Sequence, residues 1–141
     1  MAGDPRLFRM IDANLNRASE GLRVTEDVLR FVLDRRVLSG EARRLRHEAE
    51  SAVRLAAPRA VLVAARDTAG DVGRRRWRTR DRRGGTRDLL AANLRRAQES
   101  ARVLEEAARA LHRPAAVLRL QRWRYVLYAF ERRIWAACRL P

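Results

Sequence analysis

The apolar positions of the chain follow helical spacing over most of its length. Asp4 and Pro5 form a typical helix start, and apolar residues then recur every three or four positions. The first apolar stripe comprises Leu7, Ile11, Leu15, Ala18, Leu22, Thr25, Leu29 and Val32. Similar stripes occupy about 39–57, 86–111 and 115–138. The pattern predicts long amphipathic helices in these segments and a short helix over 59–65, after Pro58.

Two of the predicted helices have closely similar sequences. Residues 11–30 and 90–109 are identical at ten of twenty positions, at a constant offset of 79. The shared pattern is A-N-L-x-R-A-x-E-x-x-R-V-x-E-[DE]. A weaker match between 45–47 and 123–125 follows, at an offset of 78. We interpret the similarity as an internal duplication.

The duplication defines the expected fold. We expect one all-α domain over 1–141, a bundle of two pseudo-symmetric helical hairpins. Its parts are repeat 1 at about 5–57, a linker over 58–85 and repeat 2 at about 86–139.

Composition restricts the chemistry. All 32 basic residues are arginine, and with 17 acidic residues they give a net charge of +15. The absence of lysine excludes a Walker P-loop and Schiff-base catalysis. One cysteine, Cys138, and two histidines exclude a disulfide framework and a Cys/His zinc site. The longest apolar run, Ala60–Ala65, is too short to span a membrane, and the first residues do not resemble a signal peptide, so we expect a cytoplasmic protein.

The linker holds the densest charge. Residues 66–87 contain nine arginines and three aspartates, and seven of those arginines fall within 74–83. Like charges at this density repel one another, so we expect a mobile loop over 74–85. It is either a solvated connection or a functional segment, which would cover an anionic ligand or contact a nucleic acid with Trp77.

Polar residues interrupt the repeated stripe. Asn14 falls within it, and Arg17 and Glu26 lie on its two margins. The second copy places Asn93, Arg96 and Glu105 identically. A buried amide requires hydrogen bonds, so the asparagines either bond to each other or to backbone, or line a polar pocket between the hairpins. In such a pocket the amide would recognise a heterocycle, the arginine a phosphate and the carboxylate a magnesium ion.

Five ordered motifs carry a resemblance to a known family. They are I-D-A-N-L-N-R-A-S-E-G-L-R-V-T-E-D-V-L-R-F-V-L-D, L-R-H-E, R-D-T-A-G-D-V-G, A-N-L-R-R-A-Q-E-S-A-R-V-L-E-E and R-Y-V-L-Y-A-F-E. With these motifs the chain resembles the alternative, all-helical hydroxymethylpyrimidine phosphate kinase family of thiamin biosynthesis, a domain often fused N-terminal to thiamine-phosphate synthase. The resemblance implies conversion of hydroxymethylpyrimidine phosphate to the diphosphate with ATP. The arginine run at 74–83 departs from the family pattern.

That reaction assigns roles to the polar residues. The nucleophile is a phosphate oxygen that is largely ionised at neutral pH, so fixed positive charge is needed rather than a general base. The candidates for that catalytic charge are Arg17, Arg23, Arg96 and Arg102. Asn14 and Asn93 are expected to bind the aminopyrimidine. Arg46 and Arg124 either complete the substrate site or pair with Glu26 and Glu105.

The turn after the short helix is the second candidate site. Asp67 and Asp71 are the expected magnesium ligands, and Arg66 and the amides of Gly70 and Gly73 are expected to contact phosphate. The alternative is that the aspartates merely cap a helix connection. Further carboxylates that could hold the metal are Glu20, Glu26, Glu99 and Glu105.

Two other functions fit the sequence. An arginine-rich helical protein could bind nucleic acid, but the repeat pairs its arginines with glutamates, which weakens the basic surface that nucleic-acid binding requires. The chain could also be a non-catalytic partner module of thiamine-phosphate synthase. The expected ligands are a pyrimidine phosphate and ATP with Mg²⁺, without a membrane; homo-oligomers are compatible with the sequence.

Overall fold

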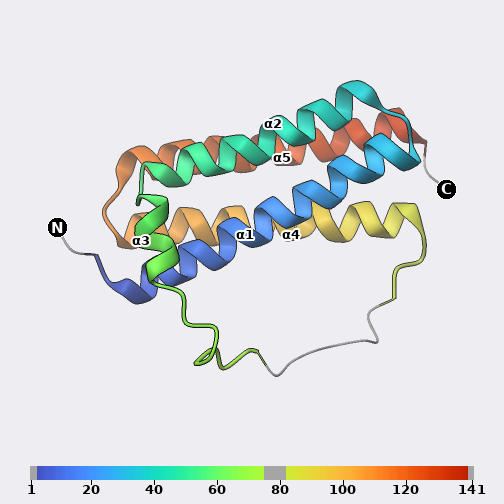
Figure 1. Ribbon diagram of the computed structural model, residues 1–141. Coiled ribbons are helices and arrows are strands. Elements are labelled where there is room, and N and C mark those ends of the chain that lie inside the picture. The colour runs from blue at the N-terminus through green and yellow to red at the C-terminus, as the bar shows by residue number, and fades with distance from the viewer. Residues whose placement is uncertain (1–2, 75–81, 140–141) are drawn as a thin grey trace.

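The computed structural model describes residues 3–74 and 82–139, and these residues form an all-α fold without strands (Figure 1). Most of the arginine-rich segment expected to be mobile lies outside them. The elements in chain order are α1 (Pro5–Asp27), η1 (Val28–Val32), α2 (Arg36–Arg54), α3 (Arg59–Ala64), α4 (Thr86–Ala110) and α5 (Pro114–Cys138). The helix boundaries therefore agree with the sequence pattern to within a few residues.

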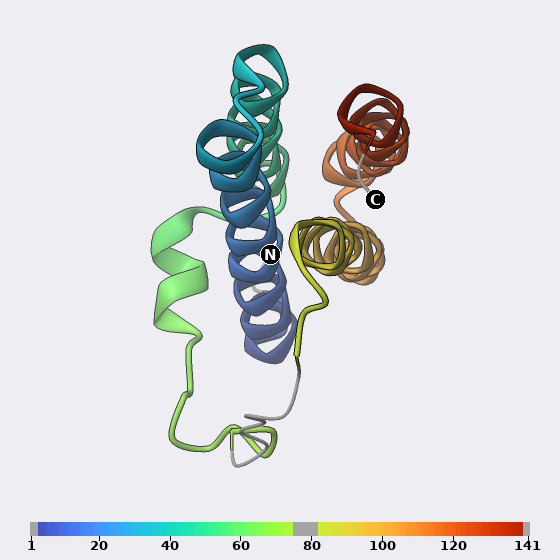
Figure 2. The same cartoon turned by 90° about the vertical axis from the view of Figure 1, so that its right-hand side faces the viewer.

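Each predicted hairpin is present, and the two hairpins pack face to face. In the first, α2 returns along α1, and in the second α5 returns along α4. Between the hairpins, α1 packs on α4 and α2 packs on α5. Figure 2 shows α3 on the side of α1 that faces away from α4. The bundle thus has its most extensive contact between the two helices that carry the repeated sequence.

The core follows the predicted stripes. Leu15 and Leu22 on α1 and Leu94 and Leu104 on α4 are buried. In the second layer, the buried Trp123 indole N–H donates to the carbonyl oxygen of Leu45 at 3.0 Å, which joins α5 to α2. Among the residues that the structure describes, none of the helices combines the length and apolar character that a membrane span requires.

One stripe position was predicted wrongly. Val32 was expected in the core but is 57% exposed, whereas Val28 is buried. The end of the first helix forms the π-helical segment η1, in which the Leu33 N–H donates to the Val28 carbonyl five residues earlier. This wider turn shifts the helical register. It therefore brings Val28 and Leu29 inward and turns Val32 toward solvent.

A glycine sets the distance between α1 and α4. The Gly21 backbone lies so close to α4 that a Cβ atom there would stand 2.6 Å from the Asn93 carbonyl oxygen. Gly40, in α2, has open space around the same position. The closest approach of the two repeats therefore depends on a missing side chain.

Buried ion pairs hold the helices of each hairpin together at equivalent positions. Arg46 on α2 binds Glu26 on α1, with 3.1 Å between Nη2 and Oε2. Arg124 on α5 binds Glu105 on α4, with 3.0 Å between Nε and Oε2. The two ion pairs thus lie at equivalent positions of the two hairpins.

Glu105 has the larger set of partners. Its side chain is fully buried and also accepts hydrogen bonds from Arg109 and Arg102. Burial raises the pKa of Glu105, but the hydrogen bonds from Arg109 and Arg124 outweigh that effect and hold the pKa below its ordinary value. The carboxylate is therefore charged in the folded protein.

The close approach at Gly21 predicts opposite results for two glycine substitutions. Gly21→Ala should lower the free energy of unfolding by about 1–2 kcal/mol, because overpacking α1 against α4 exceeds the gain in helix propensity. Gly40→Ala should raise it by up to about 1 kcal/mol. Denaturant unfolding followed by circular dichroism measures both, and equal effects of the two substitutions would contradict the close contact.

The Glu105 cluster predicts a pH-dependent loss of stability. Glu105→Gln should lower the free energy of unfolding by about 3 kcal/mol at neutral pH, because the arginines lose a buried counter-charge. Glu106→Gln, at the exposed neighbouring carboxylate, should cost less than about 1 kcal/mol.

Melting temperatures measured at acidic pH test this prediction. The folded pKa of Glu105 is depressed, so its contribution is complete above the unfolded pKa and disappears as the pH falls through the folded value. The difference in melting temperature between wild type and Glu105→Gln should therefore narrow in acid. A difference that stays constant from neutral to acidic pH would contradict a charged Glu105.

Candidate functional site

Polar side chains from both repeats meet in a hollow where α1 packs on α4. The hollow has a volume of about 330 Å³. Its lining residues are Asn14 and Arg17 from α1 and Arg96, Glu99, Ser100 and Val103 from α4. Four of these were candidate site residues from the sequence. The structure therefore brings an amide, two guanidinium groups and a carboxylate to one place.

The repeated asparagines are held by their own helices. The Asn14 amide nitrogen donates to the Met10 carbonyl at 2.9 Å, and the Asn93 amide nitrogen donates to the Leu89 carbonyl at 2.8 Å. They do not bond to each other, so of the structural alternatives only the backbone contact is present. The amide oxygen of Asn14 remains near Arg17, at 3.5 Å from Nη1.

Asn93 lines a second hollow, on the outer side of α4. This hollow measures about 540 Å³. It is lined by Arg83, Asp88, Ala91, Ala92, Asn93, Arg95, Arg96 and Glu99. Arg96 and Glu99 are shared with the hollow at the α1–α4 contact, so the two spaces adjoin at these side chains.

The turn after α3 is fastened to the polar face of α1. Arg66 binds the buried carboxylate of Asp12 with two nitrogens, one of them Nη2 at 3.0 Å from Oδ1. These hydrogen bonds raise the pKa of Arg66. Arg9 donates to the Asp67 carbonyl oxygen at 2.9 Å. The turn is therefore held about one to two helical turns from Arg17 along α1.

The two aspartates of that turn lie close to one cation. Asp67 is 3.8 Å from Arg9 Nη1 and Asp71 is 4.0 Å from Arg9 Nη2. Each aspartate also accepts a backbone N–H, from Gly70 at 2.8 Å and from Gly73 at 3.0 Å. The capping geometry that the sequence offered as an alternative is thus present, and both glycine amides expected to contact phosphate are bound to carboxylates here.

The turn has donor atoms suited to magnesium. Both aspartate side chains are more than half exposed, and Mg²⁺ in proteins commonly takes one or two carboxylates and completes its shell with water and phosphate. Across the described ranges 3–74 and 82–139, no cluster of three or more His, Cys, Asp or Glu residues could hold a metal by itself. Asp67 and Asp71 therefore suit a magnesium ion that arrives with a phosphate ligand.

Besides Arg66 and Arg96, four of the candidate arginines are engaged in ion pairs. Arg46 binds Glu26 and Arg124 binds Glu105, which is the alternative role proposed for them. Arg23 approaches Glu26 and Asp27, and Arg102 contacts Glu105 and Glu106. None of these four arginines lines the hollow at the α1–α4 contact. Their proposed catalytic and substrate-binding roles remain predictions.

Two residues of the site were missed in the sequence. Asp12 belongs to the polar face of α1, where it is buried and binds Arg66 of the linker. Its counterpart at the offset of 79 is Ala91, so the repeat pattern did not mark it. Ser100, which corresponds to Gly21, was equally unmarked. The only signal in the sequence was that each of these polar residues corresponds to a small residue without a polar side chain in the other copy.

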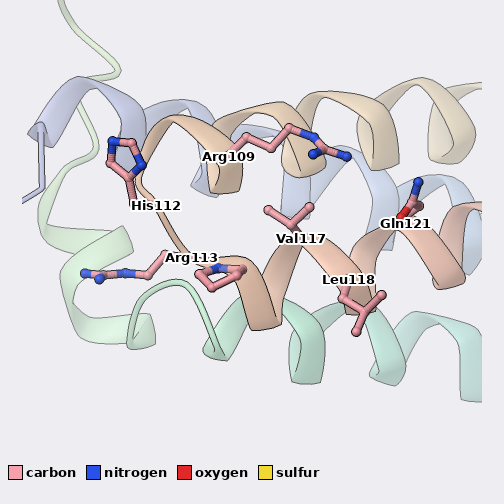
Figure 3. A pocket seen from close by; sticks show the side chains of 7 residues that line it. Arg109, His112, Arg113, Val117, Leu118 and Gln121 are labelled. Atoms are coloured by element: carbon pink, nitrogen blue, oxygen red, sulfur yellow. The ribbon is translucent and has the colours of Figure 1, made fainter.

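A larger hollow lies at the turn between α4 and α5 (Figure 3). It measures about 670 Å³ and is lined by Arg109, His112, Arg113, Pro114, Val117, Leu118 and Gln121. In Figure 3, Arg109 lies on α4, and Val117, Leu118 and Gln121 lie on α5. It contains no carboxylate and no candidate residue from the sequence, so its size alone does not favour it as the site.

Comparison with known proteins places the chain in a family. A family model described as the ThiD2 family matches residues 9–133. A thiamine-phosphate synthase from Synechocystis sp. is 41% identical over 137 residues, which cover 92% of this chain and 36% of the relative. Thiamine-phosphate synthases from Nostoc punctiforme and Rhodopirellula baltica are 38% and 34% identical, covering 89% and 91% of this chain and 34% of each relative.

The chain thus spans about a third of the length of the curated relatives it matches. No solved structure matches it. The family model covers most of the chain, including the repeated segment in both copies and the turn after α3. The chain belongs to the ThiD2 family.

Proposed function

We propose that the chain acts in thiamin biosynthesis and transfers a phosphoryl group from ATP to hydroxymethylpyrimidine phosphate, which forms the diphosphate. The membership of the ThiD2 family and the name of the relatives support the pathway. The five motifs of the sequence, which resemble the all-helical kinase family, support the reaction.

The hollow at the α1–α4 contact is the observation that carries the proposal. It places Asn14, Arg17, Arg96 and Glu99 around one space of about 330 Å³. An amide and a carboxylate can hydrogen-bond to the ring nitrogens and amino group of an aminopyrimidine. Two guanidinium groups can bind the phosphate of the same molecule. A substrate with a heterocycle and a phosphate therefore matches the lining.

The reaction requires no general base from the protein. A phosphate monoester is largely dianionic at neutral pH, so one of its oxygens can attack the terminal phosphorus of ATP directly. The new P–O bond forms as the bond between that phosphorus and the bridging oxygen breaks, and ADP leaves with the electron pair. Arg17 and Arg96 would reduce the repulsion between the two anions and align them.

The turn after α3 would serve the phosphate donor. Asp67 and Asp71 would hold a magnesium ion, which supplies charge neutralisation to the triphosphate. The Asp12–Arg66 ion pair fixes this turn against α1, on the helix that also carries Arg17. A nucleotide lying along α1 would therefore reach both the turn and the hollow.

A direct assay tests the proposed reaction. The protein is incubated with Mg²⁺, ATP and the pyrimidine monophosphate, and ADP and pyrimidine diphosphate are separated and quantified. We expect the two products in equal amounts, no diphosphate from the free pyrimidine alcohol, and little ATP hydrolysis without the pyrimidine. Absence of the diphosphate under all these conditions would refute the kinase.

A second function is favoured by the length of the relatives. Because they are about three times as long as the matched segment and are named thiamine-phosphate synthase, the chain could instead be a non-catalytic partner module of that enzyme. Adding purified thiamine-phosphate synthase to the assay separates the two functions. Diphosphate formation by the chain alone supports the kinase, and an effect confined to the rate of the added synthase supports the partner module.

The turn predicts a magnesium-dependent loss of activity. Asp71→Asn should keep the helical circular dichroism and the melting temperature, because exposed substitutions change stability by about 0.5 kcal/mol. Turnover should fall strongly at low Mg²⁺ and recover in part at high Mg²⁺, because the substitution weakens the site for the ion. Initial rates over a Mg²⁺ series measure this, and Asp67→Asn should behave similarly.

Asp34→Asn is the matched control. Asp34 is an exposed aspartate of the α1–α2 connection whose positive φ suits asparagine. It should leave the Mg²⁺ dependence unchanged. A lowered melting temperature of Asp71→Asn with normal turnover per folded molecule would show that the turn is only a helix connection.

A further inference from the structure

The repeat creates two related halves at the α1–α4 contact, and the halves differ. At the offset of 79, Asn14 corresponds to Asn93, Arg17 to Arg96, Glu20 to Glu99 and Gly21 to Ser100. A perfectly symmetric pair of repeats would form the same space twice, once around each asparagine.

Between α1 and α4, the half around Asn93 is closed. Gly21 brings α1 against the Asn93 carbonyl so tightly that even a Cβ atom would stand 2.6 Å from the oxygen. Arg96 reaches across from α4 to Glu20 on α1, with 3.2 Å between Nη2 and Oε2. Arg96, which also lines the hollow beside Asn14, thus pairs with Glu20 next to a tight backbone contact. The hollow that Asn93 lines is formed by α4 and the segment before it, without a residue of α1.

The half around Asn14 is open. Ser100 stands where Gly21 stands in the other half, and the hollow of about 330 Å³ lies beside it. Within the described part of the chain, Arg17 and Glu99 form no ion pair with each other, unlike Arg96 and Glu20. Among the described residues, the Arg17 guanidinium donates one hydrogen bond, to the amide oxygen of Asn14 at 3.5 Å.

Ser100 differs from the buried residues Thr25 and Ser39, whose hydroxyls donate to a carbonyl of their own helix. The residue is 3% exposed and lines the hollow. Buried serines and threonines in helices commonly bond to a carbonyl of the preceding turn, as Thr25 does to Gly21 at 2.9 Å. Ser100 Oγ forms no such bond among the described residues, and it is not one of their enclosed unpartnered polar atoms, so the oxygen opens into the hollow. The hydroxyl is therefore available to a ligand in the hollow.

We propose that the duplicated site is functionally single: each chain binds one pyrimidine monophosphate, in the half formed by Asn14, Arg17, Glu99 and Ser100. Ser100 is a binding residue of this half, and its hydroxyl hydrogen-bonds to the ligand. The residue pair Gly21/Ser100 determines which half is open. This inference rests on the proposed function for the identity of the ligand, while the asymmetry itself comes from the contacts at the two halves.

The two asparagines provide a matched test. Both make the same side-chain bond to a carbonyl four residues earlier, so alanine at either position should have a similar effect on stability. Isothermal titration with the pyrimidine monophosphate should give one site per wild-type chain. Asn14→Ala should weaken binding about 3- to 10-fold, as expected for the loss of one hydrogen bond, and Asn93→Ala should leave it unchanged.

Ser100→Ala tests the hydroxyl separately. It removes one oxygen and keeps the Cβ, so the fold should persist, and the dissociation constant should rise about 3- to 10-fold. Ser51→Ala on α2, away from the hollow, should have no effect. Two sites per chain, equal effects of the two asparagine variants, unchanged binding to Ser100→Ala, or no binding of the monophosphate would each overturn the inference.

Binding and turnover separate this inference from the proposed kinase. One bound monophosphate with the expected variant effects, but no diphosphate formed with ATP, would support the single site and refute the kinase. Diphosphate formation that responds equally to Asn14→Ala and Asn93→Ala would support the kinase and overturn the single site.

Discussion

The close contact of α1 with α4 is the constraint on which the rest of the structure depends. The two helices that carry the repeated sequence meet there, and Gly21 permits an approach that any side chain would prevent. Small residues bring helix axes together, and polar residues next to them then face one another across the contact. The same geometry that packs the core therefore gathers Asn14, Arg17, Arg96 and Glu99 around one hollow.

Charge serves two different purposes in this bundle. Glu26 and Glu105 are buried, and each binds an arginine from the second helix of its own hairpin. Such pairs leave no charge free for a ligand, since removing either partner would strand the other in the interior. At the α1–α4 contact the arginines and carboxylates are exposed, and only the Arg96–Glu20 pair is closed within the described residues. The buried ion pairs therefore stabilise the fold, whereas the exposed charged groups at the α1–α4 contact can bind a ligand.

Most of the fold could be predicted from the sequence because apolar periodicity reports directly on burial. The stripes identified the core helices, and the polar interruption at Asn14 correctly indicated a buried amide at 4% exposure. The outward turn of Val32 could not be foreseen, because a π-helical register shift leaves no mark in the pattern. The Arg66–Asp12 pair was also hidden, since it depends on where the linker returns to α1. Ser100 could not be predicted as a site residue, because only its position beside the hollow indicates a role in binding.

The most direct test of the α1–α4 site is an NMR titration of the isotopically labelled protein, of 16.3 kDa, with the pyrimidine monophosphate. The account predicts saturable chemical-shift changes concentrated at Asn14, Arg17, Glu99 and Ser100. Shift changes confined to Arg109, His112 and Arg113, in the larger hollow at the α4–α5 turn, would contradict it.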